Sequence, residues 1–89
     1  MEQNYPNPFN PQTTIQYKIP EKSVITINVY NVLGELIEEL IDQPHEAGVH
    51  ELEFDASNLG SGVYFYSMNA RTFDGSRSSF DVKKMMLIK

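Results

Sequence analysis

Apolar and polar side chains alternate one by one along much of this chain. Residues 14–19, 25–30 and 50–55 all follow that pattern, with Ile15 and Tyr17 among the apolar members of the first. Because successive side chains of a β-strand point to opposite faces, a period of two predicts strands with one buried and one solvated face. The pattern therefore predicts a fold built mainly from strands.

Three further stretches are predicted to be strands on other grounds. Residues 63–66 are β-branched or aromatic on both faces, which favours a central strand, and residues 80–88 are strand-like as well. Residues 35–41 also fit a helical spacing, but seven residues are short for an isolated helix. Since strands are predicted on both sides of this stretch, we predict a strand here too.

Turn-forming residues punctuate the strands at 20–23, 31–34, 43–48 and 57–62, and Asp74-Gly75 is a further hairpin-turn signal. Short alternating strands separated by such turns predict an antiparallel β-sandwich. The length of 89 residues fits one such domain with one modest core, and the absence of cysteine excludes a disulfide scaffold.

The N-terminal segment contains three prolines within six positions. Each proline excludes helix and biases the residue before it towards extended geometry. Because the segment also carries Tyr5 and Phe9, we predict that it docks on the domain and buries both rings. Residues 1–12 are thus expected to be an extended lead-in, and residues 13–89 a single β-sandwich domain.

The charge is acidic overall and unevenly distributed. The net charge is −5; residues 35–55 hold eight acids and no Lys or Arg, whereas residues 71–89 hold five bases against two acids. An acidic domain is a poor candidate for nucleic-acid binding, and no apolar run approaches the length that spans a bilayer. The two segments are expected to form complementary neighbouring strands, or one acidic and one basic face.

Catalytic and metal-binding patterns are weak. His45 and His50 lie near Glu46 and Asp55, but histidines on a loop beside acids are expected to be solvated rather than to bind zinc. The sequence contains no calcium-binding or phosphate-binding loop motif, and the paired carboxylates are predicted to lie on solvent faces. We therefore expect no enzyme activity, no metal site and no cofactor.

Tyrosines at 30, 64 and 66 allow two interpretations. They would either line one exposed sheet face as a stacking platform for sugars, or cover the core with their rings and keep the hydroxyl groups wet. We favour the second interpretation, because tyrosine commonly packs in that way.

Five ordered blocks of the chain resemble one known family. They are residues 4–15, with Asn-Tyr-Pro-Asn-Pro-Phe-Asn-Pro; 28–35, with Val-Tyr before a Gly-centred turn; 47–55, with Gly-x-His; 59–66, with Leu-x-Ser-Gly-Val-Tyr-Phe-Tyr; and 83–89, with Lys-Lys-Met-x-Leu-x-Lys. In order and spacing they are similar to type A C-terminal sorting domains of the type IX (Por) secretion system and to the related FlgD-like modules. The segment 71–79 is longer than the turn common in that family, so a lengthened hairpin is expected.

The resemblance implies an all-β fold, an immunoglobulin-like antiparallel β-sandwich of about seven strands. Turns at Gly34 and Gly62 are expected to need a positive φ or a close backbone approach. The motif residues expected to be structural are Tyr5, Pro6, Asn7, Pro8, Phe9, Val29, Tyr30, Gly34, Gly48, Gly62 and Tyr64.

The same resemblance implies a non-catalytic sorting signal that directs a larger cargo protein across the outer membrane. In this family the domain folds in the periplasm of a Gram-negative cell after Sec export, the type IX machinery recognises it, and a sortase-like enzyme often removes it. We therefore expect that machinery, that enzyme and an N-terminal cargo domain as partners, and a secreted or cell-surface location.

Recognition is expected in the last strand. An exposed edge strand adds to a partner's sheet by main-chain pairing, and its lysines would steer the encounter or protect the edge from aggregation. The candidate recognition residues are Lys83, Lys84, Met85, Leu87 and Lys89. The free domain is expected to be a monomer or a weak edge-strand dimer.

Two other functions stay open from the sequence. One is a passive accessory module of a secreted hydrolase, acting as a spacer or weak carbohydrate binder. The other is a structural assembly module like the flagellar hook cap FlgD. The position of the Lys-Lys motif at the end of the chain favours sorting, because a sorting tag of this kind is terminal.

Overall fold

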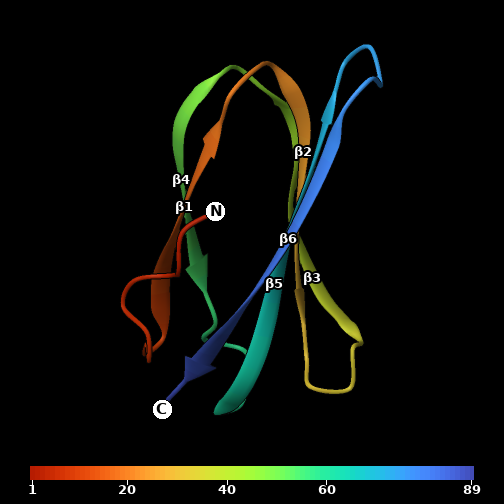
Figure 1. Ribbon diagram of the computed structural model, residues 1–89. Helices are drawn as coiled ribbons and strands as arrows, with labels where there is room; N and C mark the ends of the chain where they lie inside the picture. The colour runs from red at the N-terminus through yellow and green to blue at the C-terminus, as the bar shows by residue number, and fades with distance from the viewer.

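The computed structural model describes residues 1–89 as two antiparallel β-sheets (Figure 1). β1 and β4 form a two-stranded sheet, and the other four strands form a sheet of order β3-β2-β5-β6. The structure contains no helix with the length and apolarity that a membrane crossing requires. The strands are β1 (Gln12–Ile19), β2 (Ser23–Tyr30), β3 (Leu36–His45), β4 (Gly48–Asp55), β5 (Gly62–Thr72) and β6 (Ser78–Leu87).

The all-β, antiparallel prediction is confirmed, but the chain forms six strands rather than about seven. Residues on both sides of the Asp74 turn lengthen β5 to 11 residues and β6 to 10, and add no separate strand. In the stretch 35–41, which also fitted a helical spacing, residues 36–41 begin strand β3 as predicted. Pairing with β2 favours the strand over the helix, because a short isolated helix lacks the contacts that a paired strand gains.

The inner faces of both sheets contribute to one core. In β2 every second residue is buried, as the alternation predicts, and Ile25, Ile27 and Val29 are fully enclosed. Phe9 of the lead-in joins the same core and lies 6.3 Å from Phe54 of β4, measured between ring centroids. The core residues are Phe9, Ile15, Tyr17, Ile19, Ile25, Ile27, Val29, Phe54, Ala56, Tyr66, Met68, Met85 and Leu87.

The turn between β2 and β3 is held by hydrogen bonds to Asn31. Its side-chain Oδ1 accepts from the backbone N–H groups of Leu33 at 2.9 Å and Glu35 at 3.0 Å. Gly34 has φ 82° and Gly62 has φ 151°, so both glycines adopt the positive φ that was predicted for them.

The acidic and basic segments do not form neighbouring strands. The acids of residues 35–42 lie mainly on β3 and the lysines of residues 83–84 on β6, at opposite edges of the four-stranded sheet. The prediction of complementary neighbouring strands is therefore wrong. The sheet instead has one acidic and one basic edge, because β2 and β5 pair between them.

Candidate partner-recognition edge

Side chains of β6 alternate between the core and the outer face of the sheet. Met85 and Leu87 point into the core and are 0% and 1% exposed. Lys84 and Lys89 are exposed, and Lys83 is half-buried. The five candidate recognition residues therefore divide into two groups. Met85 and Leu87 hold β6 against the core, and the three lysines are the side chains that a partner can reach.

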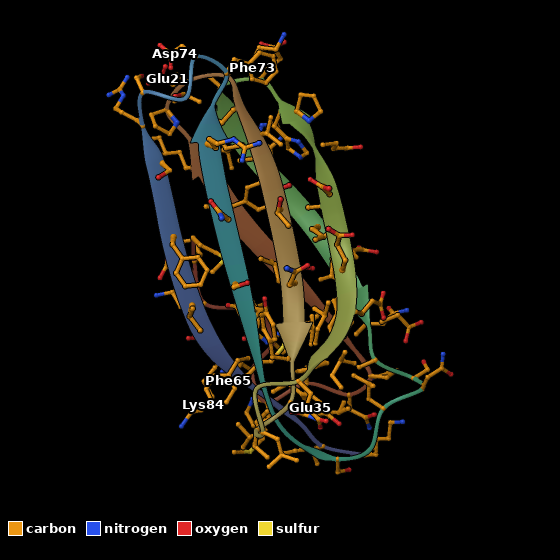
Figure 2. The ribbon with its side chains drawn as sticks, turned by 90° about the vertical axis from the view of Figure 1, so that its right-hand side faces the viewer. Glu21, Glu35, Phe65, Phe73, Asp74 and Lys84 are labelled. Carbon is orange, nitrogen blue, oxygen red and sulfur yellow. The ribbon has the colours of Figure 1, made fainter.

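The three lysines differ in how free they are. Lys89 is tied to the β4–β5 loop, because its Nζ donates to the Ser57 carbonyl at 2.6 Å and its backbone N–H donates to Ser61 Oγ at 3.0 Å. Lys83 and Lys84 make no ion pair. Figure 2 shows Lys84 near Phe65, its cross-strand neighbour on β5. Lys84 is thus the most accessible positive charge of β6.

The lead-in already covers the backbone edge of the second half of β6. Phe9 donates its N–H to the Met86 carbonyl at 3.0 Å and accepts from the Ile88 N–H at 2.9 Å. Asn7 Oδ1 accepts from the Met86 N–H at 3.0 Å, and Gln3 Nε2 donates to the Lys84 carbonyl at 2.6 Å. The expectation of a free pairing edge along residues 83–89 is therefore wrong for residues 84–88. The outward carbonyls of Lys84 and Met86 and the outward N–H groups of Met86 and Ile88 are bonded within the chain.

The lead-in pairs on its other side with β1. Glu2 donates its N–H to the Gln16 carbonyl at 2.8 Å, and Tyr5 and Thr14 exchange two backbone hydrogen bonds of 2.9 Å each. Residues 2–9 thus bridge β1 of one sheet and β6 of the other. They do so as isolated bridges rather than as a strand, since Pro6 and Pro8 interrupt the row of N–H donors.

Tyr66 anchors the lead-in from inside the core. Its hydroxyl oxygen accepts from the Asn4 N–H at 2.7 Å and donates to the Glu2 carbonyl at 3.0 Å. Burial raises the pKa of Tyr66 to about 12. Asn4, itself buried, donates through Nδ2 to Thr13 Oγ1 at 2.9 Å. Sequence reasoning missed this anchor, although the Asn-Tyr-Pro block and the Tyr-rich strand marked both ends of it.

The motif residues of the lead-in have contrasting surroundings. Phe9 is buried, but Tyr5 is 81% exposed, so the prediction that both rings are buried is wrong for Tyr5. Tyr5 pairs with β1 through its backbone, which leaves its side chain in solvent. Pro6 accepts at its carbonyl from Thr13 Oγ1 at 2.9 Å, and Pro8 is exposed.

The motif residues of the strands support the fold. Val29 is fully buried opposite Tyr66, and Gly48 begins β4 with φ 138°. Tyr64 donates its hydroxyl hydrogen to the Gly60 carbonyl at 2.8 Å. Tyr64 and Tyr66 face the core side of β5, whereas Tyr30 lies opposite Phe65 on the outer face. The three tyrosines therefore do not share a face, and they form no common stacking platform.

The two histidines meet at the end of the core rather than in solvent alone. His45 and His50 have ring centroids 4.7 Å apart, and Tyr17 Oη lies 2.9 Å from His45 Nε2. His50 Nε2 lies 2.8 Å from the Glu46 carbonyl, which only accepts, so this nitrogen carries the proton. No group of three or more His, Asp or Glu side chains is arranged to hold a metal ion. The cluster closes one end of the core with polar rings.

Comparison with family models identifies the family of the chain. The family model described as "Secretion system C-terminal sorting domain" matches residues 3–84, which includes the lead-in and most of β6. No curated protein matches the chain. Because the match spans nearly all of the fold just described, the chain belongs to the family of secretion system C-terminal sorting domains.

Proposed function

We propose that this domain is a non-catalytic sorting signal of immunoglobulin-like sandwich fold, which directs an N-terminal cargo protein across the outer membrane of a Gram-negative cell through the type IX machinery. The observation that carries the proposal is the family match over residues 3–84. The proposal includes passage through the periplasm, removal by a sortase-like enzyme, and release of the cargo to the cell surface or the medium.

The basic edge of the domain supports this proposal. Lys83 and Lys84 of β6 form no ion pair, whereas the domain as a whole has a net charge of −5. A local positive edge on an acidic domain orients the domain as it approaches an acidic partner surface. Lys83, Lys84 and Lys89 are therefore the side chains through which we expect the machinery to be contacted.

The experiment is an export assay in a bacterium that has type IX machinery. A Sec-exported fluorescent protein carries this domain at its C-terminus, and reporter outside the cell is compared with reporter in the periplasm. Removing residues 83–89 is a poor test, because it deletes the core residues Met85 and Leu87, and we expect the truncated domain to unfold. The double variant Lys83→Glu/Lys84→Glu reverses the charge of the edge without touching those residues.

Lys18→Glu is the matched control, since Lys18 is an exposed lysine on β1 of the other sheet. We expect the intact domain and the Lys18 variant to export the reporter, and the double variant to retain it in the periplasm. Circular dichroism of the purified domains checks that each variant is folded. A reporter that stays in the periplasm with the intact, folded domain would refute the sorting function in that host.

A further inference from the structure

The two sheets have four edge strands, and three of them are protected against pairing with another chain. Exposed edges are usually protected by charges, prolines, irregular register or a covering segment. β1 is covered by the lead-in, and β3 carries Pro44 and two register irregularities. β4 presents Glu51 and Glu53 on its solvent face. These three edges therefore resist strand addition.

β6 is protected only in its second half, where the lead-in binds residues 84–88. Hydrogen-bonding directions alternate along a strand, so Phe80 and Val82 turn their N–H and C=O groups outward like Lys84 and Met86. No hydrogen bond from another segment reaches these groups. The first half of β6 also contains no lysine or proline, and the side chains of Phe80 and Val82 are 66% and 46% exposed. Its one charged residue, Asp81, pairs with the N-terminal amine of Met1 at 3.7 Å.

We propose that residues 78–82 of β6 form a strand-addition site for an extended segment of a partner protein. Main-chain pairing with Phe80 and Val82 would supply the affinity, and alternate side chains of the incoming strand would supply specificity. The incoming strand would carry apolar side chains beside Phe80 and Val82. It would carry a carboxylate at the end near Lys84, because Lys84 is exposed and has no ion-pair partner.

A second copy of this chain fits the site poorly. An antiparallel pair of β6 strands centred on Phe80 places Arg77, which precedes β6 and pairs with Glu21, opposite Lys83. A pair centred on Asp81 places the two Asp81 carboxylates opposite each other, each 3.7 Å from the N-terminal amine of its own chain. Like charges in directly opposite positions destabilise a strand pair. A pair centred on Val82 requires the Lys84 carbonyl, which already accepts from Gln3. The charges of β6 therefore favour a different protein over self-pairing.

This inference rests on the proposed sorting function, because the type IX machinery is the partner in which the test is made. The inference differs from the sequence-based expectation in the place of main-chain pairing. The lead-in occupies residues 84–88, so the proposed pairing site is residues 78–82 instead. The lysines further along β6 keep the role of orienting the partner.

Val82→Pro tests the site directly, because proline removes the outward N–H and places its ring where the incoming strand would lie. The Val82 N–H makes no bond within the fold, so the ladder between β5 and β6 is preserved. Glu51→Pro on β4 is the matched control, since its N–H also points outward at an exposed edge. In the export assay we expect the Val82 variant to lower the exported fraction roughly tenfold or more and the Glu51 variant to leave it unchanged.

Phe80→Lys/Val82→Lys is the second variant, which keeps every backbone group and protects the edge in the way natural edges are protected. Its control is Phe73→Lys, an exposed phenylalanine in the turn between β5 and β6 (Figure 2). We expect only the double variant to lose export. If the intact domain exports the reporter and both β6 variants export it equally well while folded, the site is refuted and the sorting function stands. If the intact domain fails to export, the sorting function itself fails.

Sedimentation of the purified domain separates the two possible occupants. We expect a monomer at high concentration for the intact domain and for the Val82→Pro variant. A dimer of the intact domain that dissociates in the Val82→Pro variant would overturn the assignment to a different protein, because it would show that a second copy occupies residues 78–82.

Discussion

Replacing Tyr66 by Phe removes one hydroxyl group and leaves the ring in the core. In the structure that hydroxyl accepts from the Asn4 N–H at 2.7 Å and donates to the Glu2 carbonyl at 3.0 Å. The Asn4 N–H becomes a buried donor without a partner, which costs about 1–3 kcal/mol, and the Glu2 carbonyl loses a bond worth about 0.5–1.5 kcal/mol. Since Glu2 is exposed and water can replace that bond, we expect a total loss of about 1–3 kcal/mol in the free energy of unfolding.

Urea denaturation of the two proteins measures this loss as a shift of the midpoint at an unchanged slope. Tyr64→Phe is the matched control, because the Tyr64 hydroxyl donates at 2.8 Å to the Gly60 carbonyl in an exposed position. Water replaces that bond, so we expect the Tyr64 variant to lose less than about 1 kcal/mol. Amide exchange should also speed up at Phe9 and Ile88 in the Tyr66 variant alone, because the lead-in is released from β6.

The pH dependence of the free energy of unfolding gives an independent check on the Tyr66 hydroxyl. The pKa of Tyr66 is about 12 in the fold against 10 in an unfolded chain, because burial disfavours the charged phenolate. The unfolded chain therefore releases this proton first as pH rises. The stability that the neutral hydroxyl contributes is fully present below pH 10 and is lost between about pH 10 and 12, by roughly 2–3 kcal/mol.

The Tyr66→Phe variant has no hydroxyl to ionise and cannot lose stability in this way. The difference in the free energy of unfolding between the intact domain and this variant should therefore narrow from pH 10 to pH 12. A Tyr66 variant as stable as the Tyr64 variant at neutral pH, or a difference that stays constant up to pH 12, would contradict the role of Tyr66 as the anchor of the lead-in.

Two further substitutions test the packing of the lead-in and the backbone of the β2–β3 turn. Phe9→Ala should lower the free energy of unfolding by about 3–5 kcal/mol, because Phe9 is 2% exposed and packs on Phe54, whereas Tyr5→Ala at 81% exposure should change it by less than about 0.5 kcal/mol. Equal effects in thermal unfolding would show that the lead-in does not dock as described. Gly34→Ala should lower the free energy of unfolding by about 1–2 kcal/mol. Nothing lies within 4 Å of the added methyl group, so the loss would come from the backbone, whose φ of 82° disfavours any residue with a Cβ. Gly60→Ala is its control, with equal space and no positive φ, and a loss as large as at Gly34 would refute the backbone explanation.

Local patterns in the sequence predicted the strands, because a strand's two faces are encoded by neighbouring residues. The alternation at Ile25, Ile27 and Val29 identified the buried face of β2, and the structure confirms it. The turn glycines were identifiable for the same reason, since φ is a property of one residue. Residues 35–41 needed more than local propensity, because only pairing with β2 selects the strand over a short helix.

Residues 83–87 form a strand as predicted, but the surroundings of that strand differ from the expectation. The block of residues 83–89 looked like a free edge because its lysines and its position suggested exposure. Met85 and Leu87 instead face the core, and the outward backbone of Met86 is bonded to Asn7 and Phe9. Nothing in residues 83–89 themselves indicates this, because both partners lie almost the whole length of the chain away.

The sequence by itself thus determined which segments form strands and which of their faces are buried, since these follow from the identity and spacing of neighbouring residues. It misplaced one turn, because pairing with β2 continues β3 through residues 43–45. The tertiary structure alone decided which edges remain free. A pairing edge is free or covered according to contacts between distant segments, and the Asn7–Met86 hydrogen bond spans 79 residues. Because the lead-in bridges β1 and β6, it binds the outward backbone groups of Met86 and leaves those of Phe80 and Val82 without a partner.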